Sequence, residues 1–157
     1  MKRVWVSVAA LVVAGAVFGG FMAREYLRRG AVGVLTDGVV RDAAEIAAMA
    51  LPVLCAGTSP RNGAKGMQVD SVGEPVQLAG RDGGQVQIRD GDYLLADDDG
   101  VVVLPQRIAA VAVEGTVVLA EMERRIGEAM AQGQSRIEAM RLHDRFAHLP
   151  ALRARLA

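Results

Sequence analysis

The feature that most constrains this chain is a run of 20 residues without a charged side chain, from Val4 to Ala23. Because it follows Met1-Lys2-Arg3, the run can be a basic leader and a membrane-spanning helix. Gly15, Gly19 and Gly20 interrupt its second half, and each glycine costs about 1 kcal/mol inside a helix. We therefore prefer to divide the run into a buried strand and the start of a helix.

In this preferred interpretation, Val4 to Val8 form the strand and the helix begins near Gly19 or Gly20. A signal peptide is disfavoured as well, because no convincing small-x-small cleavage site precedes Arg24. The alternative of a membrane-anchored protein rests on the uncharged run alone. We expect no membrane partner and a cytoplasmic protein, and the single cysteine, Cys55, fits a reducing compartment.

The charge balance argues against a nucleic-acid partner. Acidic and basic residues number 18 each, whereas a surface that follows phosphates normally shows a basic excess. Aromatic residues make up only 4%, too few for base-stacking platforms. With 52% apolar residues in 157, the chain can build one domain with a real core.

The order of hydrophobic patterns predicts a mixed α/β fold. The first part alternates helices and short apolar runs typical of buried strands. We expect helices over 21–29 and 43–50, strands over 31–36 and 51–56, and a loop over 57–66.

After this loop the hydrophobic period changes to two, which indicates antiparallel strands. Short alternating runs include Val76 to Leu78 and Val86 to Ile88. Between the turns that follow, Tyr93 to Ala96 is predicted as a strand and Val101 to Leu104 as a β-branched strand. Beyond Pro105 the pattern is helical, over about 106–131 and 135–143. We predict a single domain over 1–157 whose helical extension begins at about residue 106.

Four segments in one order resemble a known family. Gly30 to Asp42 (GAVGVLTDGVVRD) is similar to a signature G-x-x-G-x-V-x-D-G-x-x-R-D, and Gly57 to Pro60 to the loop after the next strand. Val72 to Val76 is a weaker match, and Gly91 to Pro105 the closest. The family joins regulator of ribonuclease activity A to the metal-dependent 4-hydroxy-4-methyl-2-oxoglutarate aldolases.

The resemblance implies a compact α/β fold of the swivelling β/β/α type. A central barrel-like sheet is flanked by helices, a helix lies at the C-terminus, and subunits assemble as a homotrimer or homohexamer with active sites between them. Family members usually carry further elements upstream, so the domain in this chain looks incomplete. Relatives cleave 2-oxo acids to pyruvate or decarboxylate oxaloacetate.

By the same resemblance, Asp42 holds Mg²⁺ or Mn²⁺ and Arg41 binds the substrate's carboxylate or oxo group. The backbone N–H groups of Gly19, Gly20, Phe21 and Met22, at a helix start, bind the pyruvyl carboxylate. These residue types suit the chemistry. Mg²⁺ needs few protein ligands, arginine matches a carboxylate, and a helix N-terminus favours anions.

One departure from the family concerns Gly20. The family's aldolases commonly carry an acidic residue at this place, directly after the first glycine, where it helps to hold metal-bound water. Its absence supports an alternative, a non-catalytic protein that binds a ribonuclease as the regulator does. A further alternative is structural, with Asp42 as an ordinary N-cap and Arg41 as a surface charge.

Two other acidic clusters have simpler interpretations. Asp97 to Asp99 lacks the alternating ligands of a calcium loop, so we expect a solvated turn. The glutamates on the long C-terminal helix are explained by ion pairs one turn apart, such as Glu121 with Arg125 and Arg124 with Glu128.

Overall fold

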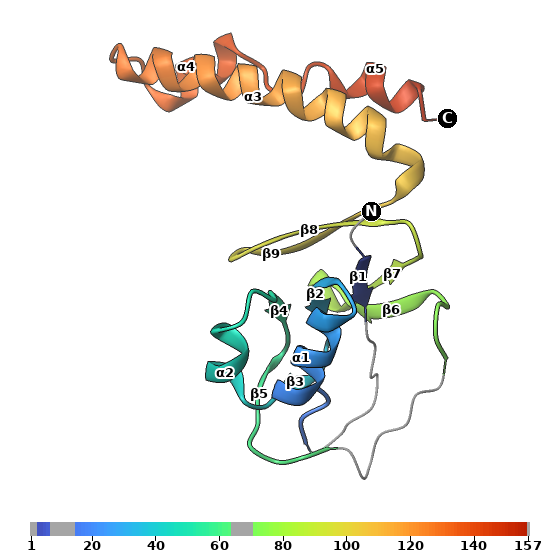
Figure 1. Ribbon diagram of the computed structural model, residues 1–157. Coiled ribbons are helices and arrows are strands. Elements are labelled where there is room, and N and C mark those ends of the chain that lie inside the picture. The colour runs from blue at the N-terminus through green and yellow to red at the C-terminus, as the bar shows by residue number, and fades with distance from the viewer. Residues whose placement is uncertain (1–2, 7–14, 64–70, 157) are drawn as a thin grey trace. The chain divides into compact units, whose positions relative to one another are not determined.

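The computed structural model describes residues 3–6, 15–63 and 71–156, which form two compact units, Met1–Val103 and Leu104–Ala157. Figure 1 labels the elements along the chain. The strands are β1 Arg3–Val6, β2 Ala31–Leu35, β3 Val39–Val40, β4 Val53–Leu54, β5 Gly57–Thr58, β6 Val76–Ala79, β7 Gln85–Ile88, β8 Tyr93–Asp97 and β9 Gly100–Leu104. The helices are α1 Gly20–Arg28, α2 Ala43–Ala47, α3 Ala109–Ala131, α4 Arg136–Leu142 and α5 Leu149–Ala154, with short 3-10 turns at Arg81–Gly83 and Gln106–Ile108.

The first unit begins with parallel strands. β1, β2 and β4 form a three-stranded sheet in the order β1-β2-β4, and β3 pairs with β5 beside it. Single bridges from Phe18 to Val40 and from Ala16 to Asn62 extend this pairing, also in parallel. The segment before α1 is therefore held against β3 and the loop after β5.

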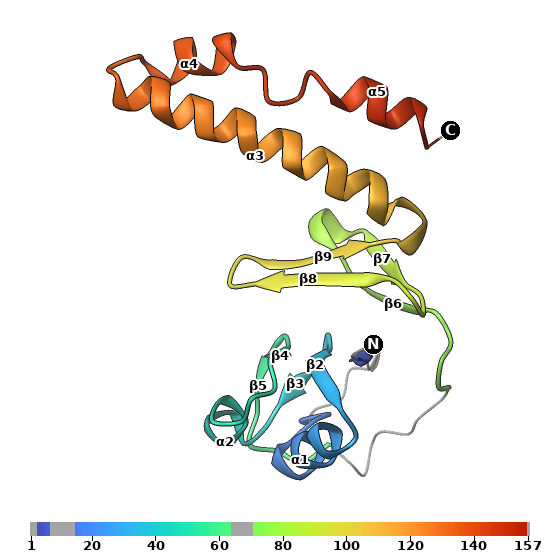
Figure 2. The ribbon, with the colours of Figure 1, turned by 45° about the horizontal axis from the view of Figure 1, so that its top comes forward.

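A small apolar core lies between this sheet and α1. Ala23 and Val34 are almost completely buried, with Phe18, Val40 and Ile46 around them. Ala23 faces the core because it lies one turn into α1, and Phe18 packs against Tyr26 with ring centroids 5.4 Å apart. Figure 2 shows α1 beside β2 and β3. The core thus fixes where α1 begins.

Two antiparallel pairs follow. β6 pairs with β7 in the register Val76 to Ile88 and Ala79 to Gln85, and β8 and β9 form a hairpin around Asp98 and Asp99. The predicted solvated turn is confirmed, because the Asp99 N–H donates to Asp97 Oδ1 at 2.9 Å and these residues are exposed.

Helices make up the second unit. α4 and α5 pack against α3. Gly115 on α3 allows the close approach of Leu152 from α5, because a Cβ at position 115 would lie 2.7 Å from Leu152 Cδ1. Ser135 and Glu138 form a capping box at the N-terminus of α4. α5 lies beyond the helices that the sequence patterns predicted. Among the described residues, the helices are too short or too polar for any of them to cross a membrane.

The mixed α/β character is confirmed, but the barrel-like central sheet is not. The described strands form one three-stranded and three two-stranded sheets. The strand β1, Arg3–Val6, extends into the uncharged run, and a helix starts within the run at Gly20. Residues 7–14 of the run lie outside the described part.

Some predicted boundaries were wrong. The helix expected over 43–50 ends at Ala47, and the strand expected over 51–56 is only Val53–Leu54. The loop expected over 57–66 opens with β5, because Gly57 and Thr58 pair with β3. Such short parallel pairs depend on a partner strand rather than on local pattern.

Candidate active site

The candidate site lies at the N-terminus of α1, where the chain passes from an extended segment into the helix. Gly19 is the N-cap residue with an extended backbone and makes no side-chain cap. The Ala23 N–H donates to the Gly19 carbonyl, which starts the helical ladder. The N–H groups of residues 20–22 therefore have no partner within the helix and can meet an anion.

Asp42 supplies a carboxylate to this helix end from a distant part of the chain. Its Oδ2 accepts a hydrogen bond from the Gly20 N–H at 3.0 Å. Its backbone is left-handed, with φ 58° and ψ 34°, and it is the one non-glycine residue with positive φ in the described part of the chain. Its side chain caps no N–H of its own helix α2. Asp42 is therefore the N-cap residue of α2 by position, but its side chain does not cap that helix, because the carboxylate turns towards α1 instead.

Arg41 lies beside this carboxylate. Its N–H donates to the Phe18 carbonyl at 3.0 Å, which fixes the backbone next to the α1 start. Its Nε lies 3.5 Å from Asp42 Oδ2, and both side chains are about one-third exposed. A cation and an anion therefore adjoin the free N–H groups and remain accessible to solutes.

Glycine at position 19 is required by the close approach of these side chains. A Cβ there would lie 2.9 Å from Arg41 Nε and 3.1 Å from Asp42 Oδ2. At position 20 a Cβ would lie 2.7 Å from Glu45 Oε1 and 3.0 Å from Glu45 Oε2. The Glu45 carboxylate thus fills the space beside Gly20.

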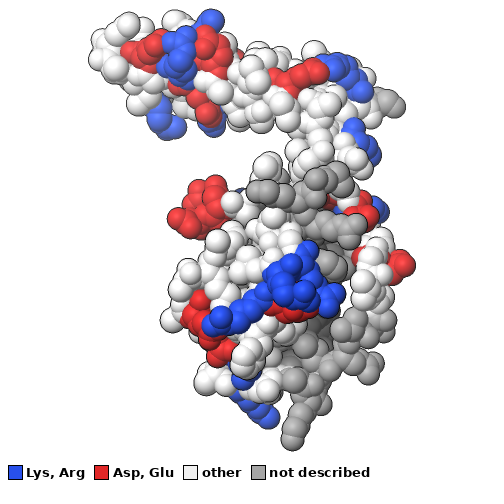
Figure 3. Space-filling model, viewed as in Figure 1, with Lys and Arg blue, Asp and Glu red and all other residues white. Residues whose placement is uncertain are grey.

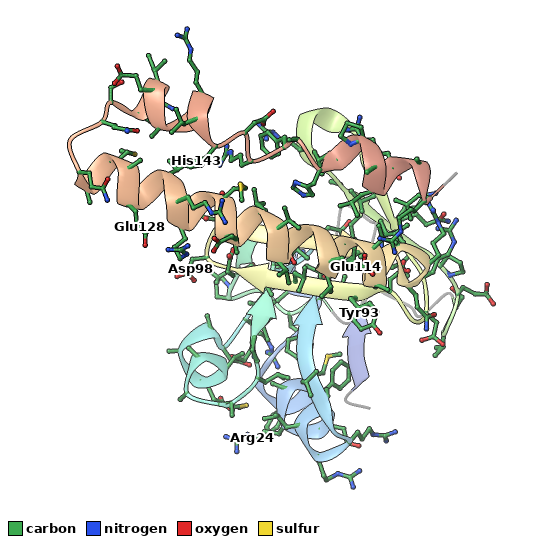
Figure 4. All side chains as sticks on the ribbon, turned by 90° about the horizontal axis from the view of Figure 1, so that it is seen from above. Arg24, Tyr93, Asp98, Glu114, Glu128 and His143 are labelled. Atoms are coloured by element: carbon green, nitrogen blue, oxygen red, sulfur yellow. The ribbon has the colours of Figure 1, made fainter. Side chains whose placement is uncertain are left out.

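Arg24 holds Glu45 in this place. Its Nε and Nη2 donate to Glu45 Oε1 at 3.1 and 2.8 Å, which joins α1 to α2. Arg24 extends from α1 in Figure 4. Figure 3 shows basic side chains gathered over α1, with acidic ones next to them. At the site itself, Arg24 pairs with Glu45 and Arg41 lies beside Asp42, so its charges balance locally.

A small hollow of about 160 Å³ opens at this helix start. Its lining combines one guanidinium, one amide and several apolar side chains: Ala16, Val17, Phe18, Gly19, Phe21, Met22, Arg41 and Asn62. Phe21 is 83% exposed at its mouth. A larger hollow, of about 470 Å³, lies under α2 and has a mainly apolar lining that includes Cys55. The smaller one adjoins the charged groups and suits a small anion.

The structure brings together all six residues predicted for the site. Gly19, Phe21, Met22 and Arg41 line the hollow, and Gly20 binds Asp42 directly. Their roles stay predictions. Sequence reasoning missed Asn62, which only the parallel bridge to Ala16 brings here.

Sequence reasoning also missed Glu45, although this residue follows Asp42 by only three positions, in the first turn of α2.

The donor set fits a hard divalent cation held by few protein ligands. Asp42 is 38% exposed, and its Oδ1 is not occupied by the bond to Gly20. Within the described residues there is no group of three or more His, Cys, Asp or Glu side chains suited to a metal. A single carboxylate of this kind suits Mg²⁺ or Mn²⁺, which take few protein ligands and keep several waters.

Comparison with known proteins agrees with the motif. The model of a family described as "RraA-like: Aldolase/RraA" matches residues 2–103. This chain belongs to the RraA-like family. An uncharacterised protein of Methanocaldococcus jannaschii is 30% identical over 127 residues, which are 81% of this chain and 58% of that protein. A putative 4-hydroxy-4-methyl-2-oxoglutarate aldolase of Thermus thermophilus is 34% identical over 91 residues, 58% of this chain and 52% of the relative.

Solved protein structures are similar as well. An uncharacterised protein from Pseudomonas syringae superposes with a TM-score of 0.76 at 30% identity, covering 87% of this chain and 62% of that one. The RNA-processing inhibitor RraA from Thermus superposes with a TM-score of 0.51 at 29% identity, and the match covers 64% of this chain and 58% of that one. The chain thus spans about half to three-fifths of the length of these relatives. Their names include both a putative aldolase and an inhibitor of RNA processing.

Proposed function

We propose that this chain belongs to a divalent-metal-dependent lyase that splits or decarboxylates 2-oxo acids and releases pyruvate. The observation that carries the proposal is the meeting of Arg41, Asp42 and the first-turn N–H groups of α1. Together they provide an anion site and a guanidinium in one small hollow, with the Asp42 carboxylate next to it on the Gly20 N–H. The names of the aldolase relatives point to the same chemistry.

Each residue has a defined task in this proposal. The N–H groups of Phe21 and Met22 receive the substrate carboxylate, while the Gly20 N–H orients Asp42. Arg41 binds the substrate's carboxylate or 2-oxo oxygen through its planar guanidinium. Asp42 holds Mg²⁺ or Mn²⁺, which when bound supplies positive charge to stabilise the enolate left by carbon–carbon cleavage.

Oxaloacetate and 4-hydroxy-4-methyl-2-oxoglutarate are the proposed substrates. A cytoplasmic homotrimer or homohexamer is the proposed form, again by likeness to the family.

The test measures pyruvate release from oxaloacetate through a lactate dehydrogenase couple. We expect release above the metal-only blank with Mg²⁺ or Mn²⁺, and none with a chelator. Asp42→Ala should lower kcat/KM at least about 100-fold, since it removes the cation ligand. Asp99→Ala, in an exposed turn, serves as the matched control. An Asp42→Ala variant with unchanged chelator-sensitive activity would contradict the proposal.

The second candidate is a non-catalytic protein that binds a ribonuclease. It is favoured by the lack of a side chain at Gly20 and by the similarity to the RNA-processing inhibitor RraA. Folded protein that releases no pyruvate but retains ribonuclease E in a pull-down would favour this function over the lyase.

A further inference from the structure

Two carboxylates of the α2 start converge on the first residue of α1. Asp42 Oδ2 binds the Gly20 N–H, and both Glu45 oxygens lie within 3.0 Å of the position that a Gly20 Cβ would take. Asp42 is the N-cap residue of α2, and Glu45 lies in the first turn of that helix. Two like charges meet here only because cations face them, Arg24 from α1 and Arg41 from the β3–α2 junction.

The two carboxylates differ in what they are free to do. Asp42 has its Oδ2 engaged by a backbone N–H and is the proposed cation ligand. Arg24 donates two hydrogen bonds to Glu45 Oε1, and the Glu45 side chain is 44% exposed. Glu45 Oε2 is therefore the oxygen that these two bonds leave unengaged, and it lies next to Gly20 at the start of α1.

Cleavage of a 4-hydroxy-2-oxo acid needs a group that accepts a proton. Arg41 cannot serve, because a guanidinium stays protonated and has no acceptor atom. The N–H groups of α1 only donate. Among the described side chains, Glu45 is the remaining acid–base group in contact with the helix start at Gly20.

We propose that Glu45 transfers the proton in aldol cleavage, an inference that rests on the proposed function. With 4-hydroxy-4-methyl-2-oxoglutarate, Glu45 takes the proton of the C4 hydroxyl, the C3–C4 bond breaks, and the C4–O bond becomes a carbonyl. The electron pair of the broken bond stays on C3 as the enolate of one pyruvate. Glu45 returns the proton to C3, so that two pyruvates form and its carboxylate is regenerated.

Decarboxylation of oxaloacetate distinguishes proton transfer by Glu45 from the roles of the other site residues. Its decarboxylation breaks a carbon–carbon bond without removing a hydroxyl proton, and the resulting enolate can take a proton from water. Both reactions need Arg41, Asp42 and the cation, but only cleavage needs an acceptor for the hydroxyl proton. Glu45 should therefore matter for one substrate and much less for the other.

The experiment compares wild type, Glu45→Gln, Glu45→Asp and Glu25→Gln with both substrates and Mg²⁺. We expect Glu45→Gln to lower kcat for cleavage about 100- to 10,000-fold, the usual contribution of a general base, and kcat for oxaloacetate less than about fivefold. Glu45→Asp should restore part of the cleavage. Glu25→Gln, an exposed glutamate paired with Arg28 and Arg29 on α1, should behave as wild type.

Each outcome decides the inference. Selective loss of cleavage with oxaloacetate turnover retained supports it. Equal loss of both activities makes Glu45 structural or a cation ligand, and loss of neither makes it irrelevant, so both overturn it. Wild type that decarboxylates but does not cleave overturns the Glu45 role and leaves the metal-lyase proposal standing. Wild type with neither activity overturns both.

Discussion

At the scale of single residues, Asp42 shows how a strained backbone directs a side chain. Its left-handed conformation costs most residues about 1–2 kcal/mol, and Asp and Asn tolerate it best. In return the carboxylate reaches across 22 residues to the Gly20 N–H instead of capping α2. Strain of this kind gathers at functional sites because the surrounding contacts hold it in place.

This backbone predicts different effects of two substitutions. Asp42→Asn keeps a hydrogen-bond acceptor and tolerates positive φ, so the free energy of unfolding should fall by less than about 0.5 kcal/mol. Asp42→Ala loses both the acceptor and the tolerance of positive φ, so the free energy of unfolding should fall by about 1–2 kcal/mol. Urea denaturation followed by circular dichroism measures the difference. Equal stability of the two variants would show that the strain is relieved elsewhere.

At the scale of elements, α3 is stabilised along its exposed side by ion pairs one turn apart. Arg124 bonds Glu121 at 2.9 Å and also pairs with Glu128, and Arg125 bonds Glu121 at 2.7 Å. The predicted pairs are thus confirmed, and Glu114 and Glu128 are seen along the helix in Figure 4. Hydrogen bonds from Arg124 and Arg125 lower the pKa of Glu121 to about 2.

The Glu121 pairs predict a pH dependence of helix stability. Because the folded-state pKa is below the ordinary value of 4.5, the stabilisation is complete above about pH 4.5 and is lost as pH falls towards 2. Glu121→Gln should therefore lower the melting temperature slightly at about pH 6 and not at about pH 2, as pairs at the surface are weak. Thermal melts at both pH values test this. A constant difference across that range would contradict it.

At the scale of the whole molecule, each unit leaves large apolar side chains uncovered. Tyr93 and Leu95 project from one face of β8 and are more than half exposed, as is Val102 on β9. Val113 and Val117 are exposed one turn apart on α3. A two-stranded hairpin with an open apolar face is only marginally stable by itself, and such surfaces mark interaction sites.

These surfaces, together with the likeness to the family, predict that copies of the chain associate. We expect sedimentation equilibrium to give a mass that is three or six times the 16.6 kDa of one chain. Leu95→Lys with Val102→Lys should shift the mass towards one copy, because charges cannot be buried unpaired. A wild-type mass of one chain would show that these faces are not covered by a second copy.

The sequence alone determined the elements whose pattern is local and repeated. α1 and α3 were predicted because apolar residues recur at helical spacing. Strands β6 to β9 were predicted because short apolar runs lie between clear turns. The motif ending in Arg41 and Asp42 also identified the family, which the match over residues 2–103 confirmed. Each of these signals is carried by neighbouring residues.

Only the tertiary structure decided what depends on contacts between distant residues. The direction of the Asp42 side chain, the filling of the Gly20 space by Glu45 and the place of Asn62 all follow from parallel pairing of short strands. A two-residue strand such as β5 has no period of its own, so its pairing is set by the partner and by the core. Some residues of the candidate site could therefore be predicted from the sequence, whereas their arrangement in space is known only from the tertiary structure.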